Sequence, residues 1–112
     1  MTKLTRADLQ ACMADGQPIL VEALAPMYFE DAHLPGAINT PHEQVDELAS
    51  ELLPDRNAEI VVYCASTTCQ NSEIVARRLE QLGYSNVSEY VDGKADWIEA
   101  GLPVESSAEV SL

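Results

Sequence analysis

Basic residues are scarce in this chain of 112 residues. Six lysines and arginines stand against 19 aspartates and glutamates, which gives a formal net charge of −13 at pH 7. A field of that sign repels nucleic acids, anionic membranes and small anions. We therefore expect no nucleic-acid partner and no membrane partner, although acidic side chains also keep an ordinary domain soluble.

Long hydrophobic runs and a cysteine framework are also missing. No apolar run approaches the length that spans a bilayer, and the polar start MTKLTRADLQ lacks the apolar stretch of a signal peptide. Three cysteines are too few, and odd in number, for a set of structural disulfides. These absences predict a cytoplasmic protein whose thiols are either reactive or simply buried.

The residues that are present suffice for one folded domain. Hydrophobic residues make up 46% of the chain, and its length is ordinary for a single core. No repeat, low-complexity block or linker interrupts it. We expect a single domain over residues 1–104 and a polar C-terminal tail over residues 105–112.

Strand and helix patterns alternate along the chain. Buried strands are expected at 18–23, 59–64 and 87–91, with a short strand after the Pro35-Gly36 turn. Helical patterns lie between and around them, at 5–16, 27–33, 39–54, 72–83 and 94–101. This alternation requires crossover connections. It predicts an α/β fold with three layers, α/β/α, around a central and mostly parallel sheet.

Helix starts carry their own signals. Thr5 is expected to cap the first helix. Thr40, followed by Pro41 at the first helical position, is expected to cap the helix of 39–54. Ser72 is expected to cap the helix that follows the second long strand, and Asn71 is the alternative cap.

Two of the three cysteines flank one short turn between a strand and a helix. Cys64 ends an apolar strand, and Cys69 stands just before the next helix. Because sites on parallel sheets lie beyond the carboxyl ends of the strands, this loop is a candidate active site. Backbone N–H groups and a helix N-terminus stabilise anions, so a thiolate in the loop would be a nucleophile near neutral pH.

The candidate site comprises the whole loop. Cys64 and Cys69 are the candidate catalytic residues, and both are expected to be more exposed than Cys12. The candidate substrate-binding residues lie between and after these two cysteines: Ala65, Ser66, Thr67, Thr68, Gln70, Asn71 and Ser72.

Other residues with chemical potential are expected to be structural. Cys12 lies on the apolar face of the first helix and is expected in the core, as is Trp97. His33 is expected to fix a turn through hydrogen bonds. His33 and His42 offer no recognised ligand spacing with the cysteines, so neither a metal nor another cofactor is expected.

Three segments carry a family resemblance. The segment IVVYC ends at Cys64, and DGKADWIEAGLPVE follows later in the chain. The first segment is LVEALAPMYFEDAHLPGAINTP, in which eight residues match a family pattern: Pro26, Phe29, His33, Leu34, Pro35, Gly36, Ala37 and Ile38. Together the segments resemble the rhodanese-like domain family, over about residues 18–104.

The resemblance implies a rhodanese-like fold and a sulfurtransferase or persulfide carrier. Cys64 would be the family's sulfur-accepting cysteine. Its thiolate would take sulfane sulfur from a donor such as thiosulfate and pass it to a thiol or another nucleophile. The implied partners are thus a sulfur donor and a thiol acceptor, as small molecules or proteins. A non-catalytic module of this family, for protein binding or redox sensing, is the alternative.

The loop departs from the family pattern where an anion would bind. Cys69 stands at the position of the usual basic residue, and Thr67 replaces the usual glycine. The loop is also about two residues longer than the family pattern. Without an ion contact of about 1.5–3 kcal/mol, thiosulfate would depend on backbone amides alone. The resemblance therefore implies weak activity with thiosulfate.

The longer loop also resembles that of phosphatases and arsenate reductases of the same fold. In those proteins a histidine precedes the cysteine and an arginine closes the loop. Here Tyr63 precedes Cys64, and Gln70 occupies the place of the arginine. A phosphoryl transition state would lose its main electrostatic stabiliser, so phosphatase activity is not expected.

Two assignments of the cysteines are open. In the first, Cys64 accepts sulfur, and Cys69 attacks the Cys64 persulfide or closes a disulfide with it. This assignment suits a thiol-to-thiol relay or a redox-gated carrier. In the reverse assignment, Cys69 is the first nucleophile because it is nearer to the helix N-terminus.

Overall fold

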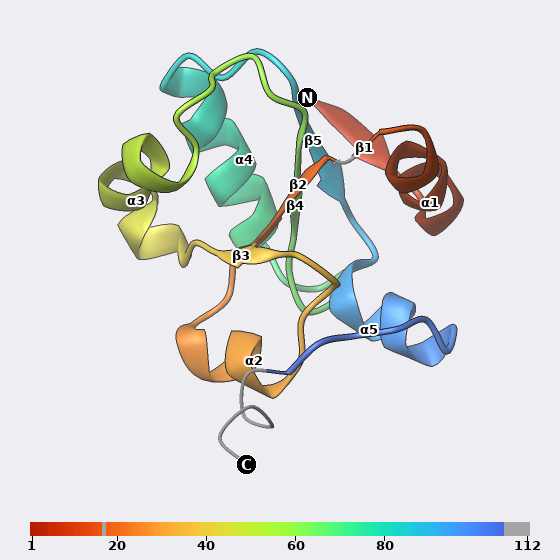
Figure 1. The fold of residues 1–112 in the computed structure, drawn as a ribbon. Helices are drawn as coiled ribbons and strands as arrows, with labels where there is room; N and C mark the ends of the chain where they lie inside the picture. The colour runs from red at the N-terminus through yellow and green to blue at the C-terminus, as the bar shows by residue number, and fades with distance from the viewer. Residues whose placement is uncertain (17, 107–112) are drawn as a thin grey trace.

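A computed structural model describes residues 1–16 and 18–106 (Figure 1). Five strands form one sheet in the order β1-β5-β4-β2-β3, and every neighbouring pair in it is parallel. The predicted α/β fold around a mostly parallel sheet is thus confirmed. The strands are β1 (Thr2–Leu4), β2 (Ile19–Glu22), β3 (Ile38–Asn39), β4 (Ile60–Tyr63) and β5 (Val87–Tyr90).

Helices cover both faces of the sheet, as Figure 1 shows. One face packs against α3 (Val45–Leu52) and α4 (Asn71–Gln81), and the other against α1 (Arg6–Asp15) and α5 (Gly93–Glu99). The short helix α2 (Pro26–Asp31) lies beyond the carboxyl end of β2. Within the described ranges, no helix has both the length and the hydropathy needed to cross a membrane.

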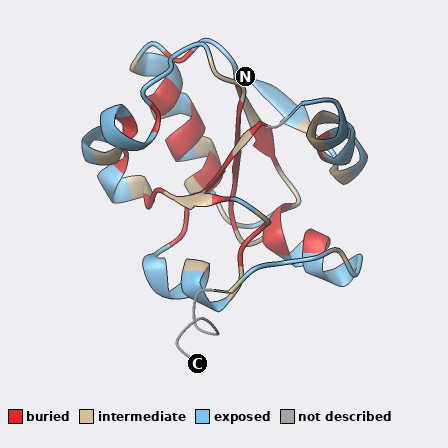
Figure 2. Cartoon of the chain, viewed as in Figure 1, coloured by how far each residue is buried: buried red, intermediate tan, exposed pale blue. Residues whose placement is uncertain are grey.

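Side-chain alternation along the strands divides the core into two halves. Val21 and Val62 face α3 and α4, whereas Leu20 and Val61 face α1 and α5. Strand β4 is buried along its whole length, as expected for a parallel strand with helices on both sides (Figure 2). The chain reaches Cys64 directly at the end of this buried strand.

The predicted start of α1 is confirmed, whereas that of α3 is wrong. Thr5 caps α1 as predicted, in a capping box with Asp8. The predicted cap at Thr40 is wrong, because its N–H donates to the carbonyl oxygen of Glu22 at 2.9 Å and keeps it at the sheet. A 3₁₀ turn, η1 (His42–Gln44), therefore follows Pro41, and α3 begins only at Val45.

The predicted cap of α4 is also wrong. Gln70 precedes the helix, without a side-chain capping bond, and both Asn71 and Ser72 lie in the first turn. Ser72 is buried and donates its hydroxyl hydrogen to the carboxylate of Glu89 at 2.6 Å. A hydroxyl held by the sheet in this way does not bond to the first N–H groups of the helix.

Two parts of the chain differ from the expected burial. Strand β1 was not predicted, because its residues Thr2, Lys3 and Leu4 are mostly exposed and show no apolar alternation.

Cys12 is half-buried, not a core residue, because it lies at the margin of α1 where Leu9 alone is fully buried. Burial and the nearby carboxylate of Glu59 raise the pKa of the Cys12 thiol.

Residues 105 and 106, the last that the structure describes, contact the rest of the domain. His33 and Glu105 exchange two backbone hydrogen bonds, of 2.9 and 2.8 Å. The Ser106 hydroxyl donates to the carbonyl oxygen of Glu30 at 3.0 Å. His33 also fixes its own turn, as expected, through a 2.7 Å bond between Nδ1 and the carbonyl oxygen of Phe29. Residues 107–112 of the expected tail lie outside the described residues, and the boundary after residue 104 stays a prediction.

The packing of α4 predicts a large difference between two residues on that helix. Leu79 is 0% exposed in the core under α3 and α4, whereas Ile74 is 46% exposed. Leu79→Ala should lower the free energy of unfolding by about 2–5 kcal/mol, because it leaves a cavity in the core. Ile74→Ala should cost less than about 1 kcal/mol. Urea unfolding of the reduced variants measures both, and equal losses would contradict this packing.

Candidate active site

The backbone after Cys64 is held by α5. The N–H of Lys94 donates to the carbonyl oxygen of Cys64, and that of Ala95 donates to the carbonyl oxygen of Ala65, both at 2.8 Å. Strand β4 lies between β5 and β2, so the loop leaves the sheet near its centre. The loop therefore starts from a fixed position at the carboxyl ends of the strands.

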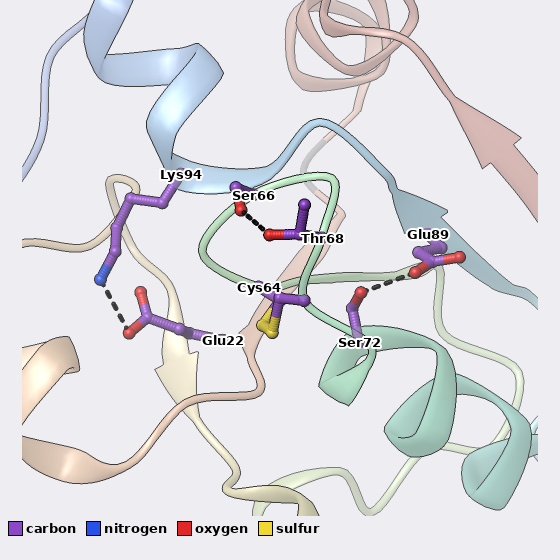
Figure 3. Close-up of a disulfide and its surroundings, with 8 residues drawn as sticks. Glu22, Cys64, Ser66, Thr68, Ser72, Glu89 and Lys94 are labelled. Atoms are coloured by element: carbon purple, nitrogen blue, oxygen red, sulfur yellow. Dashed lines mark hydrogen bonds and ion pairs between the residues drawn. A yellow bond between two sulfur atoms is a disulfide. The ribbon is translucent and has the colours of Figure 1, made fainter.

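The two loop cysteines are joined by a disulfide in this structure (Figure 3). Their Cα atoms are 6.2 Å apart, which is within the usual range for a disulfide. The turn between them is closed by a 3.1 Å hydrogen bond from the Cys69 N–H to the carbonyl oxygen of Ser66. The hydroxyl oxygens of Ser66 and Thr68 lie 3.0 Å apart. The fold thus brings together the two thiols that the sequence singled out.

Burial differs between the two cysteines. Cys64 is 1% exposed, Cys69 is half-buried, and Thr67 and Thr68 between them are exposed. The expectation that both thiols are more exposed than Cys12 is therefore wrong for Cys64. The reason is that Cys64 continues a strand that is covered on both faces, whereas Cys69 lies in the turn beyond it.

Backbone N–H groups accumulate around the loop. Among the amides of residues 65–70, that of Cys69 donates to a protein acceptor, and the others have no hydrogen-bond acceptor within the described chain. The first turn of α4 adds further unpaired N–H groups and the positive end of the helix dipole. A cluster of unpaired donors of this kind stabilises an anion.

Gly93 permits the close approach of α5 to the loop. Its φ is +71°, and a Cβ at this position would lie 2.7 Å from the carbonyl oxygen of Cys64 and 2.9 Å from the nitrogen of Ser66. Any side chain would therefore strain the backbone and collide with the loop. In the sequence, Asp92-Gly93 predicts only a turn, because the contact with Cys64 exists only in the folded chain.

A buried ion pair lies beside the loop. The Lys94 Nζ is 3.1 Å from Oε2 of Glu22, which is 0% exposed. The same ammonium group donates to the carbonyl oxygens of Tyr28, at 2.9 Å, and Ala32, at 2.6 Å. The ammonium group of Lys94 is therefore paired with Glu22, as Figure 3 shows, and is also tied to the backbone at α2.

Glu22 also accepts a hydrogen bond from Tyr63, the residue before Cys64. Its Oε1 accepts a 2.8 Å hydrogen bond from the Tyr63 hydroxyl, which in turn accepts one from the N–H of Leu34 at 3.1 Å. Burial and the Glu22 carboxylate raise the pKa of Tyr63, so its hydroxyl stays protonated and donates. The phenol is therefore a fixed donor that holds β4 to β2 just below Cys64.

A second buried carboxylate lies on the other side of β4. Glu89 on β5 is 5% exposed and accepts the Ser72 hydroxyl (Figure 3). Sequence reasoning missed Glu89, Glu22 and Lys94 as members of the site. The available signal was an acidic residue in each of two expected buried strands, ILVE and VSEY. The described residues contain no group of three or more histidines, cysteines or carboxylates able to hold a metal.

Comparison with known proteins gives consistent matches. The family described as the rhodanese-like domain matches residues 5–100. An HTH-type transcriptional regulator from Mycobacterium tuberculosis is 34% identical over 107 residues, which are 96% of this chain and 46% of that protein. The thiosulfate sulfurtransferase PspE from Escherichia coli is 32% identical over 69 residues, which are 60% of this chain and 62% of that protein. The chain thus spans less than two thirds of each of these relatives.

A solved structure matches nearly the whole chain. The crystal structure of a thiosulfate sulfurtransferase from Pseudomonas aeruginosa superimposes with a TM-score of 0.81 at 26% sequence identity. The match covers 95% of this chain and 20% of that chain. The arrangement of strands and helices around the loop is therefore one that a thiosulfate sulfurtransferase also has.

The ion pair beside the loop predicts a large effect of removing its cation. Lys94→Met should lower the free energy of unfolding by about 3–5 kcal/mol, because the buried Glu22 carboxylate loses its charged partner. Arg77→Met is the matched control, since Arg77 pairs with Glu73 at 3.1 Å on the exposed side of α4. That change should cost less than about 1 kcal/mol. Urea unfolding compares the two, and similar losses would show that the buried pair does not hold the site.

Proposed function

Because this chain belongs to the rhodanese-like domain family, we propose that it carries sulfane sulfur as a persulfide on Cys64. Relatives of the family are sulfurtransferases, which supports sulfur transfer as the general reaction. The observation that carries the finer proposal is the contact between Cys64 and Cys69 at the end of β4. Around that contact, unpaired backbone N–H groups favour a thiolate.

The first step loads sulfur onto Cys64. Its thiolate attacks the sulfane sulfur of a donor, forms a new S–S bond and displaces the rest of the donor. A persulfide donor leaves as a thiolate, and thiosulfate leaves as sulfite. The loop N–H groups stabilise the thiolate before attack and the persulfide anion after it.

The second step passes the sulfur on. An acceptor thiolate attacks the outer sulfur of the Cys64 persulfide, becomes a persulfide itself and regenerates the Cys64 thiolate. Cys69 offers a second route. Its thiolate attacks the inner sulfur of the Cys64 persulfide, which forms the Cys64–Cys69 disulfide and expels hydrosulfide. A dithiol reductant then restores both thiols and becomes a disulfide.

A redox-sensing module is the second candidate function. The disulfide favours it, because the loop then has two stable covalent states. The relative from Mycobacterium tuberculosis is named as a transcriptional regulator, and in such a setting one oxidation event per chain would suffice. The two candidates differ in turnover. A carrier transfers many sulfur atoms per chain to an added thiol, whereas a sensor transfers at most one.

Loading is tested by intact mass after reduction of the disulfide. With a small persulfide or polysulfide donor, the wild-type chain should gain one sulfur atom, because Cys64 is the attacking thiol. Cys64→Ala should abolish the gain, and Cys12→Ala, which removes the thiol farthest from the loop in sequence, should not change it. A gain that survives Cys64→Ala and disappears in Cys69→Ala would instead support the reverse assignment of the two cysteines.

The role of Cys69 is tested by the lifetime of the persulfide. Without an acceptor thiol, loaded wild-type protein should lose its extra sulfur as hydrosulfide while the disulfide forms. In Cys69→Ser the persulfide should survive at least about tenfold longer, because no thiol is held at contact distance. Sulfide release and intact mass follow both changes. Equal lifetimes in the two proteins would rule out Cys69 as the resolving thiol.

A further inference from the structure

The two buried carboxylates beside β4 differ in how their charge is balanced. Glu22 has a cationic partner in Lys94 and a phenolic donor in Tyr63. Glu89 has a neutral partner, the hydroxyl of Ser72, and takes part in no ion pair among the described residues. The Glu89 carboxylate, next to the start of α4, therefore has no cation to balance it among the described residues.

Strand register places Glu89 on the same side of the sheet as the nucleophile. Glu89 lies opposite Val62, whose side chain faces α3 and α4. Cys64 follows two residues later, so its side chain returns to that face. The spacing of neighbouring strands puts the Cα atoms of Cys64 and Glu89 about 8 Å apart. In Figure 3, Ser72 lies between them.

We propose that Glu89 is a specificity-determining residue that disfavours doubly charged sulfur donors and thereby selects donors of lower negative charge, such as persulfides of neutral or cationic thiols. This inference rests on the loading of Cys64 described above. The unpaired N–H groups of the loop stabilise one negative charge, on the sulfur of Cys64. The Glu89 carboxylate beside the loop repels the negative charge that the donor brings. The absence of a basic residue in the loop leaves that repulsion uncompensated.

The repulsion acts more strongly on a dianion than on a monoanion. The Cys64 thiolate attacks thiosulfate, a dianion, and gives the persulfide and sulfite, which carries the two negative charges of the donor. Benzenethiosulfonate gives the same persulfide and benzenesulfinate, with one negative charge. The two donors therefore deliver sulfur by the same bond exchange and differ in charge. Their ratio of loading rates separates an effect on the donor from an effect on the thiol.

The experiment measures the rate of sulfur gain by intact mass on the reduced full chain. Glu89→Gln removes the charge and keeps a group that can bond to Ser72. Its loading constant should rise about tenfold with thiosulfate and about threefold with benzenethiosulfonate, because the interaction scales with donor charge. Glu89→Met should change the ratio between the donors in the same way, which guards against a folding defect in one variant.

A control carries the opposite expectation. Glu51→Gln removes one exposed charge from α3, so its net charge equals that of Glu89→Gln. It should leave the donor ratio unchanged. A ratio that shifts equally in Glu51→Gln would overturn the proposal, because net charge alone would then set the preference.

Other outcomes are equally distinct. If Glu89→Gln and Glu89→Met speed up both donors by the same factor, Glu89 acts on the thiol and the proposed selectivity is wrong. If neither donor adds sulfur to Cys64 in any variant, loading itself fails, and the proposed function falls together with this inference. Loading that proceeds with an unchanged donor ratio overturns the inference alone.

Discussion

The buried pair of Lys94 and Glu22 is the interaction on which the geometry of the site depends. It joins the first turn of α5 to the end of β2. Through the hydrogen bond between Glu22 and Tyr63, it also reaches the residue before Cys64. The same lysine follows Gly93, which lies against the backbone of the loop. Burying two charges is costly, and here the cost is offset because every donor of the ammonium group has an acceptor. The frame around Cys64 is thus held by paired polar groups, while most N–H groups of the loop have no acceptor among the described residues.

Much of the fold could be predicted because its elements are periodic. The strands around Val21 and Val62 consist mostly of apolar and β-branched residues, and α4 shows an apolar stripe. Strand β1 carries no such pattern, since it is an exposed edge strand held by pairing with β5. The predicted caps at Thr40 and Ser72 are wrong for a related reason. Both side chains are buried at the sheet, and tertiary contacts outweigh their local capping preference.

The residues of the candidate site also differ in whether the sequence alone could predict their contacts. Cys64 and Cys69 are close in sequence, so a strand followed by a helix is enough to predict that they meet. Gly93, Lys94 and Glu22 come from segments far away along the chain, and nothing local indicates that they meet at the loop. A charged residue within an apolar strand was the available signal. It shows that a partner is needed but does not identify that partner.

The short span of the disulfide has a consequence for how this domain could communicate. The two cysteines are separated by five positions in sequence, and the ring that they close lies within one loop. By limiting its conformations, a ring of that size raises the free energy of the unfolded chain by about 2 kcal/mol. This is roughly half the value for a ring of a hundred residues. It ties no strand or helix to another, so its opening does not release any distant element. A protein that reads the oxidation state of this domain therefore has to touch the loop itself.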